Sequence, residues 1–258
     1  MTGFPYSGYA GCYLRIDLTK GKIEKHELPL EWAEMYLGGN GIGTKILWDE
    51  VPASTNPLDP GNKLIVATGP LCGSPMPNSG RLEFVAKSPL TGIYGDANAG
   101  GHFGPELKYA GYDLIIFEGR ADQPVYLLIQ NEKVEIHPAD ELWGLGTFKT
   151  ERILQEKYHD EEMKVACIGP AGETLVRFAC IQVTHRRSAA RSGIGAVMGS
   201  KNLKAIAVRG TRGLKMADPG QISTIALKLH DQIRQNQFFP GIHRYGTSGL
   251  VALVQPMG

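Results

Sequence analysis

The segment IGAVMGSKNLKAIAVRG at 194–210 has a counterpart earlier in the chain, FGPELKYAGYDLIIFEG at 103–119. In both segments a short helical pattern leads to an apolar run. In both, the second and the last residue are glycines, 15 positions apart. The shared pattern and equal spacing predict that the chain contains two copies of one structural unit.

The remaining parts of each copy follow the same order. Alternating residues around a turn predict a β-hairpin, and then come a helical pattern, a strand ending in Gly-Pro and a further apolar strand. These elements are expected at 13–24, 32–50, 64–70 and 82–85 in the first copy, and at 126–136, 147–159, 165–170 and 175–180 in the second. Hairpins look alike in many proteins, but the common order of elements favours a duplication. We therefore predict an α+β fold with two antiparallel or mixed β-sheets related by a pseudo-two-fold axis.

Composition indicates an ordinary globular protein. Of 258 residues, 42% are hydrophobic and 21% charged, and the net charge of +1 gives no reason to expect a nucleic-acid or membrane-surface partner. The four cysteines form no C-x-x-C pair, so no zinc or iron–sulfur site is expected within this stretch. Neither a signal peptide nor a run of 18 apolar residues is present, and we expect a cytoplasmic protein.

Two glycine-rich loops at equivalent positions are the candidate binding site. The first combines 77–81 with 95–101, and the second is 184–193. Small residues let the backbone approach a flat ligand, and arginines together with backbone N–H groups suit phosphate. A duplicated site of this kind predicts one symmetric ligand or two similar ligands. A single such loop would more often be a surface turn, but two at matched positions favour binding.

Other types of site are disfavoured. The glycines at 193, 195 and 199 have the wrong spacing for a dinucleotide-binding fingerprint, and those at 39, 41 and 43 lie inside a helical pattern. The basic residues at 185–191 would need a broader basic face to bind nucleic acid. Asp96, His102 and Glu106 are near the first loop, but we expect structural roles for them. No nucleophile–base pair is evident, and no catalytic residue is assigned.

The same loops carry a resemblance to a known family. The segments GRLEFVAKSPLTG at 80–92 and FGPELKYAGYD at 103–113 are similar to the first domain of the aldehyde ferredoxin oxidoreductases. So are IGPAGE at 168–173 and GIGAVMGSKNLKA at 193–205. The resemblance extends from about Gly8 to Gly210. Residues 94–98 and the helix around 148–152 are most similar to the formaldehyde-oxidising branch.

The resemblance implies a tungsto- or molybdo-bispterin cofactor lying on the two sheets. It implies cofactor contacts from Arg81, Asn98, Ala99 and Gly100 on one pterin and from Arg187, Ser188 and Ala190 on the other. A magnesium ion between the pterin phosphates would be held by the backbone carbonyls of Asn98 and Ser188. Ser188 and Ala190 replace the alanine and glycine that many members of the family have. Ser188 is expected to keep the carbonyl contact, whereas the methyl group of Ala190 is expected to crowd the ligand.

The implied activity is the oxidation of aldehydes to carboxylic acids, with ferredoxin as electron acceptor and a [4Fe-4S] cluster as intermediate carrier. The cluster ligands and the acid–base residues are expected beyond this chain, which would be inactive alone. A homodimer or an electron-transfer subunit is the expected assembly. Two alternatives remain open: a related tungsten enzyme such as a class II aryl-CoA reductase component, or a non-catalytic pterin-binding module.

The chain is expected to divide near residue 212. Residues 1–212 would form the domain that binds the cofactor. Residues 213–258 would begin a helical second domain, because apolar residues recur at helical spacing within 219–239, after an Asp218–Pro219 pair that is typical of a helix start.

Overall fold

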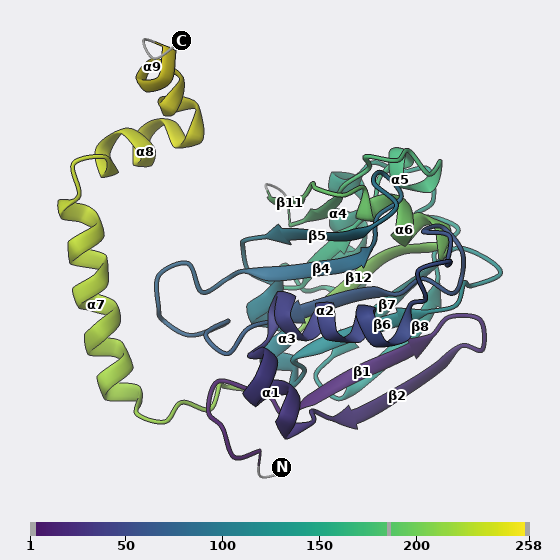
Figure 1. Ribbon diagram of the computed structural model, residues 1–258, viewed down its shortest axis with the longest axis horizontal. Helices are drawn as coiled ribbons and strands as arrows, with labels where there is room; N and C mark the ends of the chain where they lie inside the picture. The colour runs from purple at the N-terminus through teal and green to yellow at the C-terminus, as the bar shows by residue number, and fades with distance from the viewer. Residues whose placement is uncertain (1–3, 185–186, 256–258) are drawn as a thin grey trace. The chain divides into compact units, whose positions relative to one another are not determined.

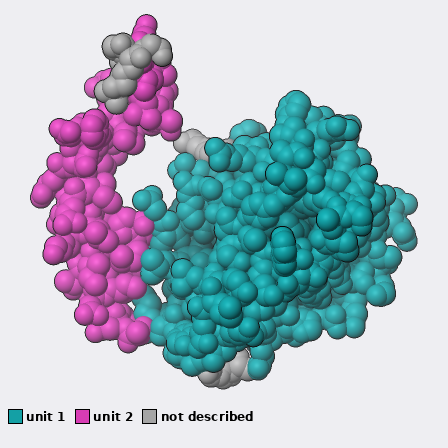
Figure 2. All heavy atoms as spheres, viewed as in Figure 1, with its two compact units in different colours: residues 1–74, 78–216 teal, residues 75–77, 217–258 magenta. Residues whose placement is uncertain are grey.

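The computed structural model describes residues 4–184 and 187–255. Figure 2 shows two compact units, one of residues 1–74 and 78–216 and the other of residues 75–77 and 217–258. All β-strands of the described chain belong to the first, which we call the sheet unit. The second, the helical unit, contains the helices after residue 217.

The sheet unit contains two six-stranded mixed sheets (Figure 1). The first has the order β2-β1-β6-β3-β4-β5. Its strands are β1 (Cys12–Asp17), β2 (Lys22–Glu27), β3 (Leu64–Thr68), β4 (Leu82–Lys87), β5 (Tyr94–Ala99) and β6 (Leu114–Glu118). The second, read from the corresponding edge, has the order β8-β7-β12-β9-β10-β11. Its strands are β7 (Val125–Gln130), β8 (Lys133–Pro138), β9 (Lys164–Cys167), β10 (Ile181–Val183), β11 (Arg187–Ala189) and β12 (Leu203–Arg209).

The two sheets are copies of one another. Adding six to each strand number of the first sheet gives the order of the second, and β1–β6 and β7–β12 are the parallel pairs. Side chains repeat as well. Tyr13 stacks on His26 with ring centroids 5.1 Å apart and planes at 21°, and Tyr126 stacks on His137 at 5.2 Å and 21°. The predicted α+β fold with an internal duplication is confirmed.

Apolar side chains fill three layers of the sheet unit. The largest cluster lies between the sheets and includes residues of the short helices α3 (Phe103–Ala110) and α6 (Ile194–Ser200). Helices α1 (Leu30–Tyr36) and α2 (Gly39–Glu50) cover the outer face of the first sheet, and α4 (Thr147–Tyr158) covers that of the second. Central strands are therefore buried on both faces, which explains their continuous apolar runs.

Two glycines of α2, Gly41 and Gly43, allow close packing. A Cβ atom at Gly43 would lie 2.8 Å from Val85 Cγ2, so glycine lets α2 lie directly on β4. A Cβ atom at Gly41 would lie 2.1 Å from the carbonyl oxygen of Tyr36. The helical pattern expected at 32–50 is divided at Leu37 and Gly38, both with positive φ.

One predicted strand was wrong. Residues 175–180 do not form a strand; the counterpart of β4 is β10, which begins at Ile181. Helix α5 (Pro170–Glu173) precedes this segment, and Leu175 has φ 60°, which a strand does not allow. The carbonyl of Ala179 accepts a hydrogen bond from Gly195 N at 3.0 Å. The segment is thus bonded to α6 rather than to a neighbouring strand.

The two glycine-rich segments predicted as loops are in large part edge strands. Residues 94–99 form β5, which pairs with β4 along its whole length, and residues 187–189 form β11, which pairs with β10. The small residues at the inward-facing positions of β5 are needed for packing. A Cβ atom at Gly95, for example, would lie 2.7 Å from the Cβ of Ser192 in the second copy.

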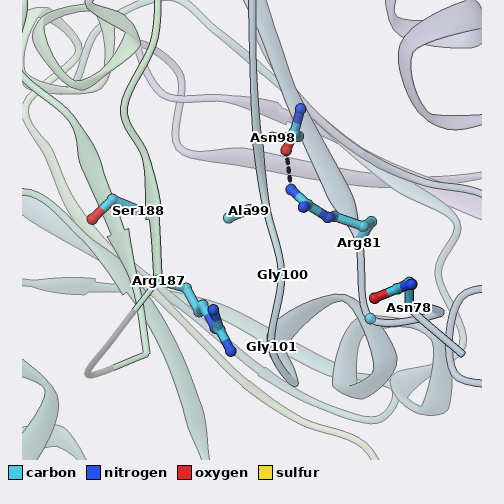
Figure 3. A pocket seen from close by; sticks show the side chains of 9 residues that line it. Asn78, Arg81, Asn98, Ala99, Gly100, Gly101, Arg187 and Ser188 are labelled. Carbon is cyan, nitrogen blue, oxygen red and sulfur yellow. Dashed lines mark hydrogen bonds between the residues drawn. The ribbon is translucent and has the colours of Figure 1, made fainter. Parts of the chain in front are cut away.

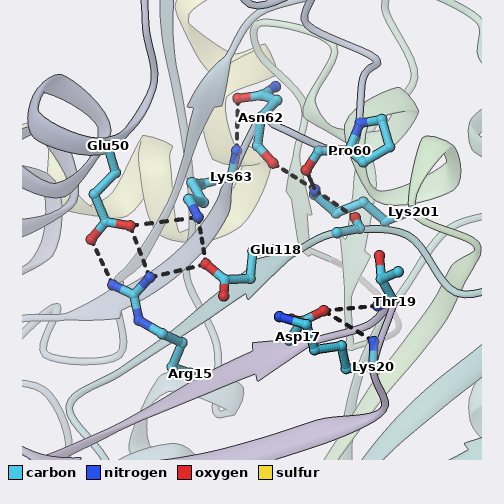
Figure 4. A network of polar contacts seen from close by, with 11 residues as sticks. Arg15, Asp17, Thr19, Lys20, Glu50, Pro60, Asn62, Lys63, Glu118 and Lys201 are labelled. Carbon is cyan, nitrogen blue, oxygen red and sulfur yellow. Dashed lines mark hydrogen bonds and ion pairs between the residues drawn. The ribbon is translucent and has the colours of Figure 1, made fainter.

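A buried lysine joins the two copies (Figure 4). Lys201, at the end of α6, is fully buried and donates hydrogen bonds to the carbonyls of Asn62 at 2.6 Å and Gly119 at 3.0 Å. A longer contact of 3.4 Å reaches the carbonyl of Pro60. All three carbonyls belong to the first copy, so Lys201 links the copies through backbone atoms.

The helical unit begins as the sequence predicts. Asp218 Oδ1 accepts a hydrogen bond from Gln221 N at 2.8 Å and thereby caps the unit's first helix. The unit contains α7 (Pro219–Gln235), α8 (Phe239–Tyr245), the 3₁₀ helix η1 (Gly246–Leu250) and α9 (Val251–Val254). Several of its apolar side chains are exposed, among them Leu227 and Phe238. Across the described residues, every helix is too short or too polar to traverse a membrane.

Replacing Lys201 tests the link between the copies. Burial, with the nearby Lys63 and Arg120 charges, lowers the pKa of Lys201 from 10.5 to about 7. The unfolded state therefore binds more protons between pH 7 and 10.5, and this lysine makes the free energy of unfolding rise with pH across that window. Lys201→Met should remove this rise and leave backbone carbonyls unpaired, so the stability of the native chain relative to the variant should increase as the pH rises from 7 to 9.

Urea unfolding at several pH values between 7 and 9 measures both effects. The exposed Lys149 on α4 provides the control Lys149→Met, which should keep the stability and pH slope of the native chain. Equal stabilities of the two variants would contradict the proposed link.

Candidate functional site

Two edge strands, one from each copy, lie close together in the sheet unit. β5 is an edge of the first sheet and β11 is the corresponding edge of the second, and the two strands are in contact. An edge strand leaves some backbone N–H and C=O groups without a strand partner. The two strands therefore present unpaired backbone groups from equivalent positions of both copies.

The register of the strands shows which positions are equivalent. Asn98 on β5 is opposite Glu83 on β4, and Ser188 on β11 is opposite Gln182 on β10. Asn98 and Ser188 thus occupy the same place in the two copies.

A pocket of about 360 Å³, which we call the edge pocket, lies at this junction (Figure 3). Its lining residues are Asn78, Gly80, Arg81, Asn98, Ala99, Gly100, Gly101, Arg187 and Ser188. Figure 3 shows Arg81 and Asn78 on one side, Arg187 and Ser188 on the other, and Gly100 and Gly101 between them.

The structure brings six of the seven predicted contact residues together in this pocket. The seventh, Ala190, follows β11 directly and is exposed, but it does not line the pocket. Asn78, Gly80 and Gly101 lie within the segments 77–81 and 95–101 of the first predicted loop, but they were not predicted as contact residues. Residues 185 and 186, which belong to the second predicted loop, lie outside the described residues.

The floor of the pocket is made of closely packed backbone. A Cβ atom at Gly80 would lie 2.2 Å from the carbonyl oxygen of Gly101, so only glycine permits this approach. Gly101 has φ 103°, a conformation that favours glycine. A Cβ atom at Gly100 would meet nothing within 4 Å. Gly100 thus borders open space in the pocket, which is the feature expected of a surface against which a flat ligand lies.

Two arginines make the pocket suited to anions. Arg81 donates a hydrogen bond from Nη1 to Oδ1 of Asn98. The guanidinium of Arg187 has no hydrogen bond or ion pair with any other residue that the structure describes. Guanidinium groups bind phosphate oxygens through paired N–H donors. The chemistry of the lining therefore fits a ligand that combines a flat ring with a phosphate group.

The strands beside the pocket, β4 and β10, differ in charge between the two copies. The register places Arg81 and Glu83 of the first copy at the positions of Cys180 and Gln182 in the second. Ser188 Oγ donates to Gln182 Oε1 at 2.6 Å, whereas Oε2 of Glu83 is buried without a hydrogen-bond partner among the described residues. Burial, and then the nearby charge of Asp96, raise the pKa of Glu83 to about 7.

The other polar residues considered from the sequence have structural positions. Glu106 is buried in α3 and accepts hydrogen bonds from Gly210 N at 2.7 Å and from Arg209. Asp96 Oδ2 accepts a long hydrogen bond of 3.5 Å from Asn40. His102 is an exposed residue that immediately precedes α3.

The described residues also lack a cluster of side chains that would bind a metal. Among them, no group of three or more His, Cys, Asp or Glu side chains has the arrangement of a metal site. All four cysteines are free. Burial raises the pKa of the Cys72 and Cys167 thiols to about 12, so both stay protonated at neutral pH.

Comparison with known proteins identifies the family. The model of the aldehyde ferredoxin oxidoreductase N-terminal domain matches residues 13–210. The chain therefore belongs to this family of tungsten-containing oxidoreductases. The assignment to its formaldehyde-oxidising branch stays a prediction.

Two curated relatives and one solved structure show the range of similar proteins. The chain is 45% identical over 252 residues to the tungsten-containing aldehyde ferredoxin oxidoreductase of Pyrococcus horikoshii, covering 97% of this chain and 42% of the relative. It is 39% identical over 219 residues to the aliphatic sulfonate oxidoreductase WOR-like subunit of Pyrococcus furiosus, covering 79% and 35%. A chain of the active-site complex BamBC of benzoyl coenzyme A reductase matches with a TM-score of 0.86 and 44% identity, covering 88% and 35%. The chain thus spans less than half the length of these proteins.

Substituting Gly100 tests the open space in the pocket. Gly100 is outside the left-handed region, and a Cβ atom there would meet no heavy atom within 4 Å. Gly100→Val should therefore change the free energy of unfolding by less than about 0.5 kcal/mol, yet its side chain would enter the pocket. We expect the variant to lose affinity for inorganic phosphate, measured by calorimetry.

The control for this substitution is Gly213→Val, since Gly213 also borders open space but does not line the pocket. Unchanged phosphate affinity in the Gly100 variant would contradict the placement of a ligand against this glycine.

Proposed function

We propose that this chain forms the cofactor-binding part of an enzyme that oxidises aldehydes to carboxylic acids and passes the electrons to ferredoxin. The observation that carries the proposal is the edge pocket. It lies where the two copies meet, has a glycine floor and contains an arginine from each copy. A duplicated scaffold with this lining suits two similar ring ligands that each carry a phosphate.

Within this proposal, a bispterin cofactor with tungsten or molybdenum lies against the edge pocket. Arg81, Asn98, Ala99 and Gly100 contact one pterin, and Arg187, Ser188 and Ala190 contact the other. Asn98 and Ser188 hold a magnesium ion through their backbone carbonyls. Support for the magnesium site comes from the strand register, because these two residues occupy equivalent positions on the two edge strands.

In this proposal, the residues of this chain bind the cofactor and orient it. The two arginines attract and align phosphate groups, and the glycine backbone lets a ring approach without steric hindrance. The bound metal would supply two-electron redox chemistry, and a [4Fe-4S] cluster would carry single electrons toward ferredoxin. The shared core between the sheets includes Ala97 and Ala99 of β5 and Ala189 of β11, and it holds the two edge strands in place.

The larger organisation follows from the same proposal. Residues 1–212 form the cofactor-binding domain, and residues 213–258 belong to a helical second domain whose exposed apolar side chains pack against further chain. Cluster ligands and acid–base residues are contributed by parts beyond this chain. We expect a cytoplasmic enzyme that acts with ferredoxin, as a homodimer or with an electron-transfer subunit. The four free cysteines agree with a reducing compartment.

A second candidate is a component of a class II aryl-CoA reductase. The 44% identity to a chain of the benzoyl coenzyme A reductase complex favours it. The two candidates share the edge pocket and differ in substrate, so assays with an aldehyde and with an aryl-CoA thioester would separate them. A pterin-binding module without catalysis is the third reading, and it predicts cofactor retention with neither activity.

Cofactor analysis of the full-length protein tests the proposal. After purification without oxygen, we expect tungsten or molybdenum by plasma mass spectrometry and two pterins per metal after oxidative release. Absence of both metals would exclude the aldehyde oxidoreductase and the aryl-CoA reductase alike.

Substitution of Arg81 tests the residue assignment. Arg81→Ala removes one guanidinium from the pocket and should lower the amount of pterin that the purified protein retains, by about tenfold if a charge-assisted hydrogen bond is lost. Arg152→Ala, at an exposed arginine of α4, is the control and should retain pterin fully. Full retention in both variants would show that Arg81 does not contact the cofactor.

A further inference from the structure

The loop that leads into β4 is held in a defined conformation. Ser79 Oγ donates to the carbonyl of Ser74 at 2.6 Å, and the carbonyl of Ser79 accepts from Gly73 N at 3.1 Å. Tyr109 of α3 donates to the carbonyl of Gly73 at 2.6 Å. These bonds close the loop on itself and attach it to α3. Asn78 therefore has a fixed place at the rim of the edge pocket.

Asn78 differs from the other asparagines that have a left-handed backbone. Its φ is 60°, and those of Asn131 and Asn202 are 55°. Asparagine adopts this conformation more readily than most residues. Asn131 uses its carboxamide to bond Thr211, and Asn202 donates to the carbonyl of Ala121 at 2.7 Å. Among described residues, nothing pairs with the carboxamide of Asn78.

The position of this carboxamide points to a ligand. Figure 3 shows Asn78 on the same side of the pocket as Arg81, with Gly100 and Gly101 between it and Arg187. A carboxamide has two N–H donors, and an anion held by a guanidinium has oxygen atoms free to accept more hydrogen bonds. Because Asn78 is neutral, it adds donors without changing the charge of the pocket.

We propose that Asn78 is a further ligand-contacting residue of the edge pocket, whose carboxamide N–H donates to an anionic oxygen held by the arginines. The inference rests on the proposed function of this pocket. It makes Asn78 a determinant of phosphate binding on the side of the first copy.

Two substitutions distinguish this role from a turn-forming role. Asn78→Gly keeps the left-handed backbone and removes the carboxamide, so the chain should stay folded and bind inorganic phosphate about tenfold more weakly. Asn78→Asp keeps the shape and places a carboxylate in the pocket, so it should bind more weakly still. Asn56→Asp is the control, because Asn56 is exposed, lies outside the pocket and bonds Leu58 N through its oxygen, which aspartate retains.

The measurement is phosphate titration of the chain by ¹H–¹⁵N spectra, following the amides of Gly100 and Gly101, with thermal unfolding as the check on folding. Native affinity in both Asn78 variants, together with loss in Arg81→Ala, would overturn the assignment of Asn78 and leave the pocket in place. Two outcomes would overturn the pocket's assignment and the inference with it. One is absence of phosphate binding to the native chain, and the other is binding that Arg81→Ala and Arg187→Ala leave unchanged.

Discussion

The structure depends on the shared core between the two sheets. Each sheet has an apolar inner face, and neither can be covered by its own outer helices. The inner faces pack together with α3 and α6 into one cluster of buried residues. This packing sets the relative position of the copies, and with it the approach of β5 to β11. Lys201 adds polar links between the copies at a fully buried position.

The edge pocket follows from this arrangement. Edge strands are a liability in most proteins, because their unpaired backbone groups attract other strands. Here two equivalent edges lie together, and small residues such as Gly95 let them pack closely. The duplication alone would produce a symmetric site. The first copy has Arg81 and Glu83 where the second copy has Cys180 and Gln182, so the two copies differ chemically beside the pocket. A ligand with two similar halves would meet different partners on each side.

The free polar groups of the pocket share one physical feature. The guanidinium of Arg187 and the carboxamide of Asn78 have no protein partner within the described part of the chain, although Arg187 lies on a paired strand and Asn78 in a hydrogen-bonded loop. Ordered polar groups without partners lose hydration when a surface is covered, and this loss is compensated only if the covering ligand provides acceptors. The pocket is therefore organised for an anionic ligand. This chemistry agrees with the chain's membership of the aldehyde ferredoxin oxidoreductase family.

The sequence by itself determined the duplication, the α+β class and the family, because repeated spacing and apolar periodicity are local properties of the chain. It also indicated six of the residues that line the pocket. It did not show that the glycine-rich segments are edge strands, since small residues in a strand that packs closely resemble the small residues of a turn. It misplaced β10, because the carbonyl of Ala179 bonds to α6 and this contact is not local. Asn78 lies within the first predicted loop but was not predicted as a contact residue, because an asparagine near a glycine is typical of a turn. Only the folded structure, by bonding that loop to α3 and placing Asn78 across Gly100 and Gly101 from Arg187, decided that this residue lines the pocket.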